Sequence, residues 1–338
     1  MKKIMLLILL GILNTTFAAF QLPTPEYKHA RGYGAKAKVI FNIVDEEGKP
    51  VEGADVSANF YMQMHKKNRV KGKIDKNGIF VAAKKCRGEV NFIIKKDGYY
   101  RTHDTIKVYG TRDNRAEVKD GKWMPYGKTH KVVLKKIKNP IPVISYKILI
   151  KQKPRDIPLG FDLQKGDFLP PYGCGEVSDF YMTFEQEEAT EESLERFKYT
   201  FSFPNKYDGY IIRDIHNYSE FRSDYNAPTD DVYQQEYFSV IGLDNKRPDV
   251  VIDIENKYMI LRTRSKTNEN GELEEAYYSK IFFTGDGNLT YVSFNVYANP
   301  DLNSTNLEFN LKENRFSPLP DVKTDEIETQ YWKWWTEK

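Results

Sequence analysis

Cysteine and histidine are scarce in this sequence. Its 338 residues include two cysteines and five histidines. Two cysteines are too few for a small domain held together by several disulfides. A zinc peptidase carries two of its metal ligands in an HxxE or HExxH pattern, and none of the five histidines lies in one. The sequence therefore predicts no metal site and no zinc-dependent hydrolysis.

Other catalytic signatures are missing as well. The chain has no GxSxG nucleophile, no glycine-rich phosphate loop and no Cys/His cluster at metal-ligand spacing. We therefore expect no catalytic residue, no cofactor and a protein that is not an enzyme. A glycoside-active enzyme stays open as the alternative, because its two carboxylates need only meet in space, about 5–10 Å apart.

Long apolar runs are limited to one, at the start of the chain. Lys2 and Lys3 precede an apolar stretch from Ile4 to Leu13. This stretch is shorter than the roughly 20 residues that cross a bilayer, and it is typical of a signal peptide. We predict a signal peptide at residues 1–18, cleaved near Ala18, and a secreted, periplasmic or cell-surface protein without a transmembrane segment. An uncleaved membrane anchor is the alternative.

Charge divides the chain into a basic and an acidic part. Residues 19–150 carry 28 Lys and Arg against 13 Asp and Glu, whereas residues 151–338 carry 21 against 35. No nucleic-acid partner is expected, because no helix gathers the lysines into a stripe that fits a groove. For an exported protein, the basic part favours an acidic polysaccharide, an envelope surface or a cell-envelope protein as partner. The alternative is a solvated surface, with the two parts attracting each other.

Alternating side chains predict a first β domain over residues 35–137. Val39, Phe41 and Ile43 alternate with less apolar residues, which is the period of a strand. Asp75–Gly78 contains Asn-Gly, the pair that fits a tight hairpin turn. Hydrophobic residues make up 40% of the chain, too many for a disordered polymer and enough for about two buried cores.

The strings VDEEGKPVEGADV, DKNGIF and VNFIIKKDGYY follow one another in this region. Residues 36–110 thereby resemble the carboxypeptidase regulatory-like domain. The resemblance implies a transthyretin-like β-sandwich of the carbohydrate-binding-like group, a module that accompanies zinc carboxypeptidases without being the catalyst. The basic insert His65–Lys71 departs from the pattern, either as a contact for an anionic partner or as a solvated loop.

A second β-sandwich, jelly-roll-like, is predicted over residues 143–320. Alternating runs such as Phe180, Met182 and Phe184 imply antiparallel sheets with one face on a core. An extended connector with two prolines precedes them. The segments GFDLQKGDFLPPYGCGEVSDF, YMILRTRSKTNENGELEEAYYSKI and NPDLNSTNLEFNLKENRF resemble uncharacterised secreted bacterial proteins, and this resemblance implies no activity.

A short amphipathic helix is predicted over residues 321–338. Ile327, Tyr331, Trp334 and Trp335 fall at the spacing of one helix face. Such a face either docks on the domain or offers its tryptophans for stacking on a sugar.

Three groups of side chains are candidates for a site. Aromatic residues near the end of the first domain and in a glycine-rich loop are candidates for stacking on a sugar ring: Tyr99, Tyr100, Trp123, Tyr126, Phe168 and Tyr172. The same loop holds the acidic group to examine first, for general acid–base chemistry or calcium, or as carboxylates that cap turns: Asp162, Asp167, Glu176 and Asp179. Cys86 and Cys174 either form a disulfide in an oxidising compartment or are small apolar side chains.

These observations favour an exported, non-enzymatic binding or adhesion protein of the cell envelope, with carbohydrate as a candidate ligand. The alternatives are the glycoside-active enzyme and a purely structural envelope component.

Overall fold

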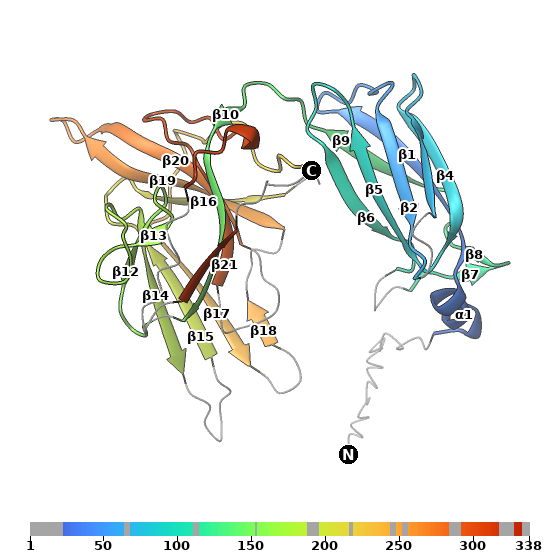
Figure 1. Cartoon of the computed structure of the whole chain (residues 1–338), viewed down its shortest axis with the longest axis horizontal. Helices are drawn as coiled ribbons and strands as arrows, with labels where there is room; N and C mark the ends of the chain where they lie inside the picture. The colour runs from blue at the N-terminus through green and yellow to red at the C-terminus, as the bar shows by residue number, and fades with distance from the viewer. Residues whose placement is uncertain are drawn as a thin grey trace, which may run out of the picture. The chain divides into compact units, whose positions relative to one another are not determined.

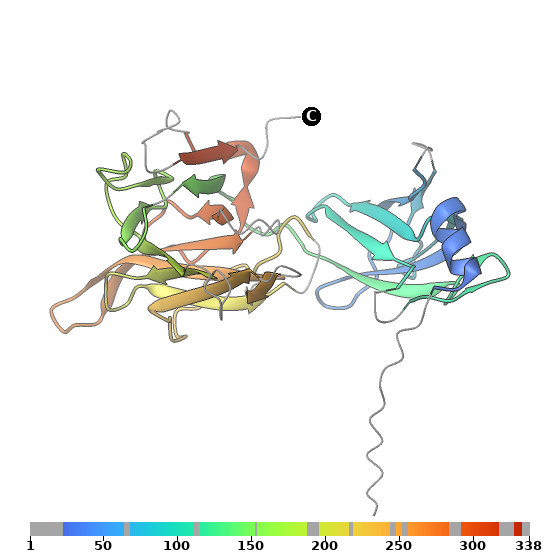
Figure 2. The ribbon, with the colours of Figure 1, turned by 90° about the horizontal axis from the view of Figure 1, so that it is seen from below.

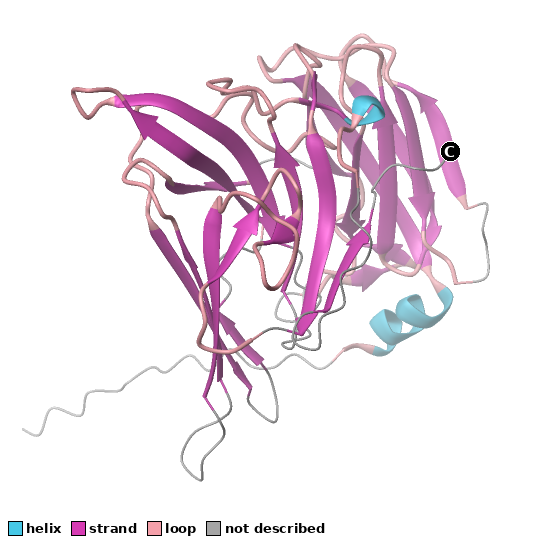
Figure 3. Cartoon of the chain, turned by 60° about the vertical axis from the view of Figure 1, so that its left-hand side comes forward, coloured by secondary structure: helices cyan, strands magenta, loops and turns pink. Residues whose placement is uncertain are grey.

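The structure is a computed structural model. It describes residues 23–63, 68–110, 115–152, 154–187, 196–215, 219–243, 248–251, 256–283, 292–317 and 328–332. The predicted signal peptide lies outside these residues. Strands dominate the described part of the chain (Figure 3), which confirms the all-β fold class. The chain divides into two compact units, one formed by residues 1–96 and 101–134, the other by residues 97–100 and 135–338.

The first unit contains two sheets (Figure 1). The five-stranded sheet has the order β4-β1-β8-β7, with β9 also paired to β1; its strands are β1 (Ala35–Asp45), β4 (Ile79–Cys86), β7 (Val118–Lys119), β8 (Lys122–Trp123) and β9 (Lys128–Leu134). The four-stranded sheet has the order β3-β2-β5-β6, with β2 (Asp55–Phe60), β3 (Arg69–Lys73), β5 (Glu89–Lys95) and β6 (Thr102–Lys107). Strand β1 pairs antiparallel with β4 and parallel with β8 and β9.

The two sheets of the first unit enclose its core. Every second residue of β1 from Ala35 to Ile43 is buried, as the alternation in the sequence predicts. Phe41 of β1 meets Phe92 of β5 edge to face, with ring centroids 5.2 Å apart. Because these strands belong to different sheets, the contact shows that the sheets face each other as a sandwich.

A tight turn is present at Asp75–Gly78, but it is not the predicted hairpin, because β3 and β4 on its two sides belong to different sheets. The carboxylate of Asp75 accepts hydrogen bonds from the backbone N–H groups of Asn77 and Ile79. Gly78 has φ +80°, and a Cβ on it would lie 2.6 Å from the carbonyl oxygen of Ile43. Only glycine fits this close approach of two backbones.

One helix was not predicted from the sequence. Helix α1 (Pro25–Tyr33) begins after Thr24, whose side chain accepts a hydrogen bond from the backbone N–H of Tyr27, and it lies beside the strands of the first unit (Figure 2). The ring of Tyr27 packs against the edge of Trp123, with centroids 5.7 Å apart. In the described part of the chain, no helix has the length and apolar character needed to span a membrane.

The second unit is built from two six-stranded sheets. One has the order β16-β19-β20-β21-β11-β23, with β11 (Ile144–Gln152), β16 (Gly209–Asp214), β19 (Lys257–Thr267), β20 (Leu273–Phe283), β21 (Val292–Ala298) and β23 (Glu328–Trp332). The other has the order β13-β12-β14-β15-β17-β18, with β12 (Leu159–Asp162), β13 (Asp167–Phe168), β14 (Phe180–Glu187), β15 (Arg196–Ser202), β17 (Glu236–Leu243) and β18 (Pro248–Val251). A short parallel pair joins β10 (Ile141–Pro142) to β22 (Phe309–Asn310), followed by the 3-10 helix η1 (Leu311–Glu313).

Aromatic side chains join the two six-stranded sheets across one core. Phe161 of β12 meets Phe294 of β21 with ring centroids 6.1 Å apart, and Phe201 of β15 meets Phe283 of β20 at 5.5 Å. Both pairs cross from one sheet to the other. The neighbouring strands within each six-stranded sheet are antiparallel, as the alternating apolar pattern indicates.

The helix predicted for residues 321–338 is wrong where the structure describes this segment. Residues Glu328–Trp332 form β23, which pairs antiparallel with β11 and places Tyr331 opposite Ile148. Threonine, tyrosine and tryptophan favour strands, and β11 offers backbone hydrogen bonds that a helix would not use. Ile327, Trp334 and Trp335 lie outside the described residues.

We predict that Gly78→Ala destabilises the first unit more than Gly48→Ala does. Both glycines have positive φ, so either substitution costs about 1–2 kcal/mol in backbone strain. Only at Gly78 does the added Cβ also meet backbone atoms, whereas nothing lies within 4 Å of a Cβ at Gly48. Hydrogen exchange of the β1 amides would measure the difference. Equal destabilisation by the two substitutions would contradict the close approach at Gly78.

Candidate functional site

The four acidic residues singled out from the sequence come together around β12 and β13. Asp162 ends β12, Asp167 begins β13 and Asp179 directly precedes β14. These three side chains are buried, at 1–2% exposure. Glu176 differs from them, because it is exposed and forms a surface ion pair with Lys165, with 3.0 Å between Oε1 and Nζ.

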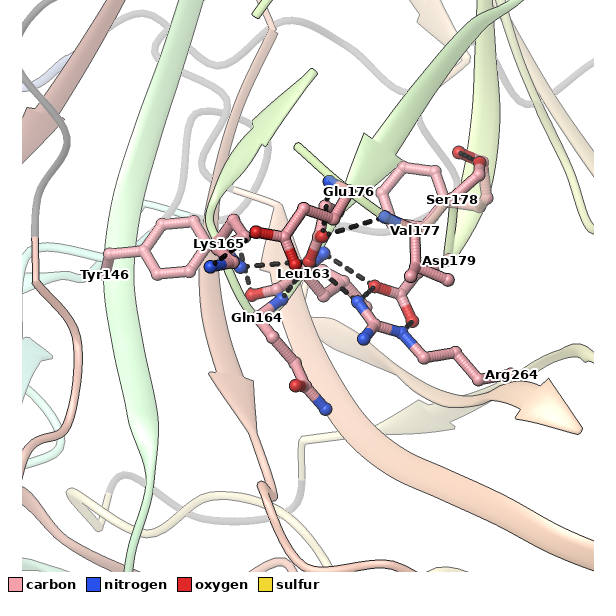
Figure 4. Close-up of polar contacts among 11 residues, drawn as sticks. Tyr146, Leu163, Gln164, Lys165, Glu176, Val177, Ser178, Asp179 and Arg264 are labelled. Atoms are coloured by element: carbon pink, nitrogen blue, oxygen red, sulfur yellow. Dashed lines mark hydrogen bonds and ion pairs between the residues drawn. The ribbon is translucent and has the colours of Figure 1, made fainter. Parts of the chain in front are cut away.

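An arginine that the sequence does not single out binds two of these acids. Arg264 has φ +53° and lies where the pairing of β19 and β20 shifts register. Its Nε donates to Oδ1 of Asp179 at 2.9 Å, and its Nη2 donates to Oδ2 of Asp179 at 2.8 Å and to Oδ1 of Asp162 at 2.7 Å (Figure 4). The irregular backbone thus aims one guanidinium at two carboxylates.

Backbone N–H groups also donate hydrogen bonds to these two carboxylates. Asp162 accepts from four of them, those of Gln164, Lys165, Glu176 and Val177. Burial raises the pKa of Asp162, but these hydrogen bonds and the charge of Arg264 outweigh burial, so that the pKa is lowered. Burial raises the pKa of Asp179, and the ion pair with Arg264 opposes that rise.

This arrangement gives the acidic loop a structural role. Asp162 and Asp179 are hidden from solvent and bound by the chain itself, so they hold the loop against the β19–β20 hairpin. A glycoside-active pair needs two carboxylates that meet a substrate and a water molecule. Among the described residues, no three His, Cys, Asp or Glu side chains are grouped so that they could hold a metal ion.

The candidate aromatic residues fall into two classes. Three are buried: Tyr100 donates a hydrogen bond from its hydroxyl to Glu308, Trp123 donates from Nε1 to the carbonyl oxygen of Cys86, and Phe168 is fully buried. Their rings pack into cores and do not present a face to a sugar. Tyr99 and Tyr172 are half-buried, and Tyr126 is 37% exposed.

Both cysteines are described, and both are free thiols. Cys86 is buried on β4, and burial raises the pKa of its thiol to about 11, which makes it a small apolar side chain. Cys174 is exposed in the glycine-rich loop.

A buried lysine is the second charged group that the sequence did not reveal. Lys280 of β20 is 0% exposed, and its Nζ donates to Oγ of Ser223 and to the carbonyl oxygen of Leu307, both at 2.7 Å. Three rings surround the amine: those of Phe221, Phe309 and Tyr297 have their centroids 4.2, 4.8 and 5.2 Å from Nζ. Burial lowers the pKa of Lys280 well below its usual range, and the charge of Lys135 adds to this effect.

Five lysines form a surface on the first unit, which we call the lysine face; Lys36, Lys85 and Lys131 are exposed, whereas Lys38 and Lys122 are half-buried. All five lie on the outer side of the five-stranded sheet, away from the core: Lys36, Lys38, Lys85, Lys122 and Lys131. The side follows from β1, where Lys36 and Lys38 alternate with buried residues. In register, Lys36 stands directly opposite both Lys85 and Lys122. Three lysines thus form one row across three neighbouring strands.

The row of lysines works against the stability of the sheet. Like charges directly opposite each other on neighbouring strands are destabilising. The five strands contain eight lysines and one carboxylate, the buried Asp45. The structure records no ion pair between a lysine of the face and any carboxylate in the described ranges. Unbalanced charge of this kind is expected where a surface serves a ligand.

Neutral side chains complete the lysine face. Lys122 places its Nζ 5.5 Å from the centroid of the exposed Tyr126 ring. Ile40 stands opposite Val81, which is 48% exposed, so that an apolar patch adjoins the lysines. The Lys-x-Lys spacing at residues 36–38 was visible in the sequence as two side chains on one face of a strand. The strand register that places Lys85 and Lys122 beside Lys36 was not visible in the sequence.

Comparison with known proteins gives only distant similarity. No family model matches the chain, and no curated protein matches its sequence. The similar solved structures include 3-chlorocatechol 1,2-dioxygenase from Rhodococcus opacus, hydroxyquinol 1,2-dioxygenase from Pseudomonas putida and catechol 1,2-dioxygenase from Acinetobacter radioresistens. Their sequence identities are 15%, 17% and 15%, and their TM-scores are 0.25, 0.22 and 0.23. The matches cover 31%, 31% and 32% of this chain and 61%, 57% and 55% of those chains.

This comparison corrects one expectation from the sequence. We expected a protein that is not an enzyme, whereas the solved structures similar to it are enzymes. The non-enzymatic assignment is therefore withdrawn. The chain spans little more than half the length of these dioxygenases, and at these TM-scores the similarity carries no argument about the activity of this chain.

We predict that Arg264→Met destabilises the second unit by about 3–5 kcal/mol, because it leaves two buried carboxylates without their cation. The control is Lys165→Met, which removes only the exposed ion pair to Glu176 and should cost about 1 kcal/mol or less. Hydrogen exchange of the β14 amides under native conditions would measure both free energies. A small effect of Arg264→Met would show that the ion pairs of Arg264 with Asp162 and Asp179 do not stabilise the second unit.

Lys280 predicts a pH dependence of stability. Its pKa is lowered in the folded state, so between that pKa and the unfolded value of about 10.4 the unfolded chain binds more protons. Raising the pH within this window therefore stabilises the folded state, by at most about 1.4 kcal/mol per pH unit for one proton. We expect Lys280→Met to flatten the rise in the free energy of unfolding between pH 7 and pH 9.5. An unchanged slope in this variant would show that Lys280 keeps its proton on folding.

Proposed function

We propose that the protein is exported and binds a polysaccharide of the cell envelope through the lysine face. The single observation that carries the proposal is the row of three opposed lysines, of which Lys36 and Lys85 are exposed and Lys122 is half-buried, without carboxylate partners in the described ranges. Such a row costs folding energy, and a ligand with negative charge offsets that cost.

Two further features support this proposal. The apolar start of the chain and its lysines are typical of a signal peptide, which directs the protein to a compartment where polysaccharides are accessible. The resemblance of residues 36–110 to the carboxypeptidase regulatory-like domain implies membership of a group of sandwiches with carbohydrate-binding-like folds. The exposed ring of Tyr126 beside Lys122 adds an aromatic surface of the kind on which sugar rings stack.

We predict that the purified protein co-sediments with insoluble envelope polysaccharide prepared from the cells that make it. Replacing Lys36, Lys85 and Lys122 together by glutamine should weaken this binding roughly tenfold or more, since each exposed ion pair contributes a few-fold. Glutamine keeps the side chains polar and removes like-charge repulsion, so the variant should fold at least as stably as the wild type.

The matched control replaces three exposed lysines of the same unit that lie outside the five-stranded sheet, Lys49, Lys76 and Lys107. This control changes the net charge equally and should bind like the wild type. Absence of binding by the wild type would overturn the polysaccharide proposal. Equal loss in the two triple variants would mean that net charge, and not the lysine face, drives binding.

A further inference from the structure

We infer that the ligand of the lysine face is a linear acidic polysaccharide whose charged groups follow the row Lys85–Lys36–Lys122 across the strands. This inference rests on the proposed function and specifies its substrate class. The argument uses the spacing of the row, its charge and the side chains beside it.

The spacing of the row favours a repeating ligand. The three lysines occupy neighbouring strands at directly opposed positions, so their Cα atoms step along the row by about 4.8 Å, the distance between paired strands. This step is close to the length of one sugar residue in an extended chain. A polymer that lies across the strands can therefore bring an anionic group to each ammonium in turn, within the reach of the flexible lysine stems.

The charge of the row selects an acidic ligand over a neutral one. A neutral sugar can accept hydrogen bonds from the lysines but leaves the repulsion within the row in place. Carboxylate, sulfate or phosphate groups form charge-assisted hydrogen bonds with the ammonium groups and remove the repulsion at the same time. Lys38, the next outward-facing residue of β1, adds a fourth positive charge beside the row.

The neutral side chains of the face fit a sugar better than a lipid bilayer. Lys122 is the last lysine of the row, and the ring of Tyr126 lies beside it. A sugar stacked on the Tyr126 ring would therefore hold an anionic substituent near the ammonium of Lys122. Val81 and Ile40 offer an apolar surface to the C–H face of a sugar ring. Proteins that lie on membranes insert larger groups such as Trp, Phe and Leu, and none of the residues on this face is of that kind.

Polygalacturonate and its fully methyl-esterified form test the charge requirement, because they share one backbone and differ only in the carboxylates. We expect the wild-type protein to bind polygalacturonate at least tenfold more tightly than the ester, measured by calorimetry at low salt. This preference should fall as salt is added, since screening weakens exposed ion pairs. Vesicles of phosphatidylglycerol serve as the lipid probe.

Oligogalacturonates of one, three and six residues test the row. Affinity should rise at least tenfold from the monomer to the trimer, which is the shortest chain that can meet all three lysines. The variant with Lys36, Lys85 and Lys122 replaced by glutamine should lose both the length dependence and the preference for the acid. A Tyr126→Leu variant, which keeps every charge, should weaken trimer binding while leaving the salt dependence as in the wild type.

Each result decides between the proposals. Equal binding of polygalacturonate and its ester would overturn the acidic ligand while leaving polysaccharide binding intact. Binding of neither form, together with failure to bind envelope polysaccharide, would overturn the proposed function itself. Tighter binding to the anionic vesicles than to polygalacturonate would overturn the inference in favour of a lipid surface. Equal affinity for the monomer and the trimer would overturn the inference that one chain contacts all three lysines of the row.

Discussion

The register of β1 against its neighbours is the constraint on which the first unit depends. Side chains alternate along a strand, so a slip of one residue would bring Lys36 and Lys38 into the core and expose Phe41. Phe41 and the residues that share its side are buried against the opposite sheet, and this burial fixes the register. The same register then sets Lys85 and Lys122 beside Lys36. The core thereby determines where the lysines meet.

The second unit shows two different ways of burying charge. Arg264 is 16% exposed and binds two buried carboxylates, whose oxygens accept hydrogen bonds from its guanidinium and from backbone N–H groups. The ammonium of Lys280 donates to two neutral oxygens, those of the Ser223 hydroxyl and the Leu307 carbonyl, and aromatic rings surround it. The first arrangement keeps its groups charged and joins the acidic loop to the β19–β20 hairpin. The second favours a neutral amine, because a ring and a carbonyl oxygen compensate burial only in part.

Local pattern was enough to predict the fold class but not the contacts between distant segments. The alternation of Phe180, Met182 and Phe184 predicts a strand that is present, and Asn-Gly marks a turn before β4, although β3 and β4 lie in different sheets and form no hairpin. The sequence does not predict the short helix α1, because its nine residues are held by a cap and by contacts of Tyr27 and Arg31 with distant residues more than by an apolar stripe. The helix predicted for the C-terminal segment is wrong, because the spacing of four apolar residues does not show that β11 has an edge free to pair with this segment.

The candidate sites show the same limit. The acidic loop was correctly gathered from its sequence, since Asp162 and Asp179 are close along the chain, but Arg264 comes from a hairpin some 85 residues further on. The sequence predicts Trp123 and Phe168 as ligand-stacking residues, whereas both are buried, because composition does not distinguish an exposed ring from a buried one. The lysine row depends on two strand pairings, β1 with β4 and β1 with β8, that no single segment contains.

Strand β4 lies at the edge of its sheet, and this position gives its lysines a second consequence. An edge strand exposes unpaired backbone groups to which another chain can add, and charged side chains such as Lys84 and Lys85 discourage that addition. A polyanion that neutralises Lys85 removes part of this protection. With the polyanionic ligand that we propose, occupancy of the face and self-association through the edge would therefore be coupled, and a saturated protein would be more prone to aggregate than a free one.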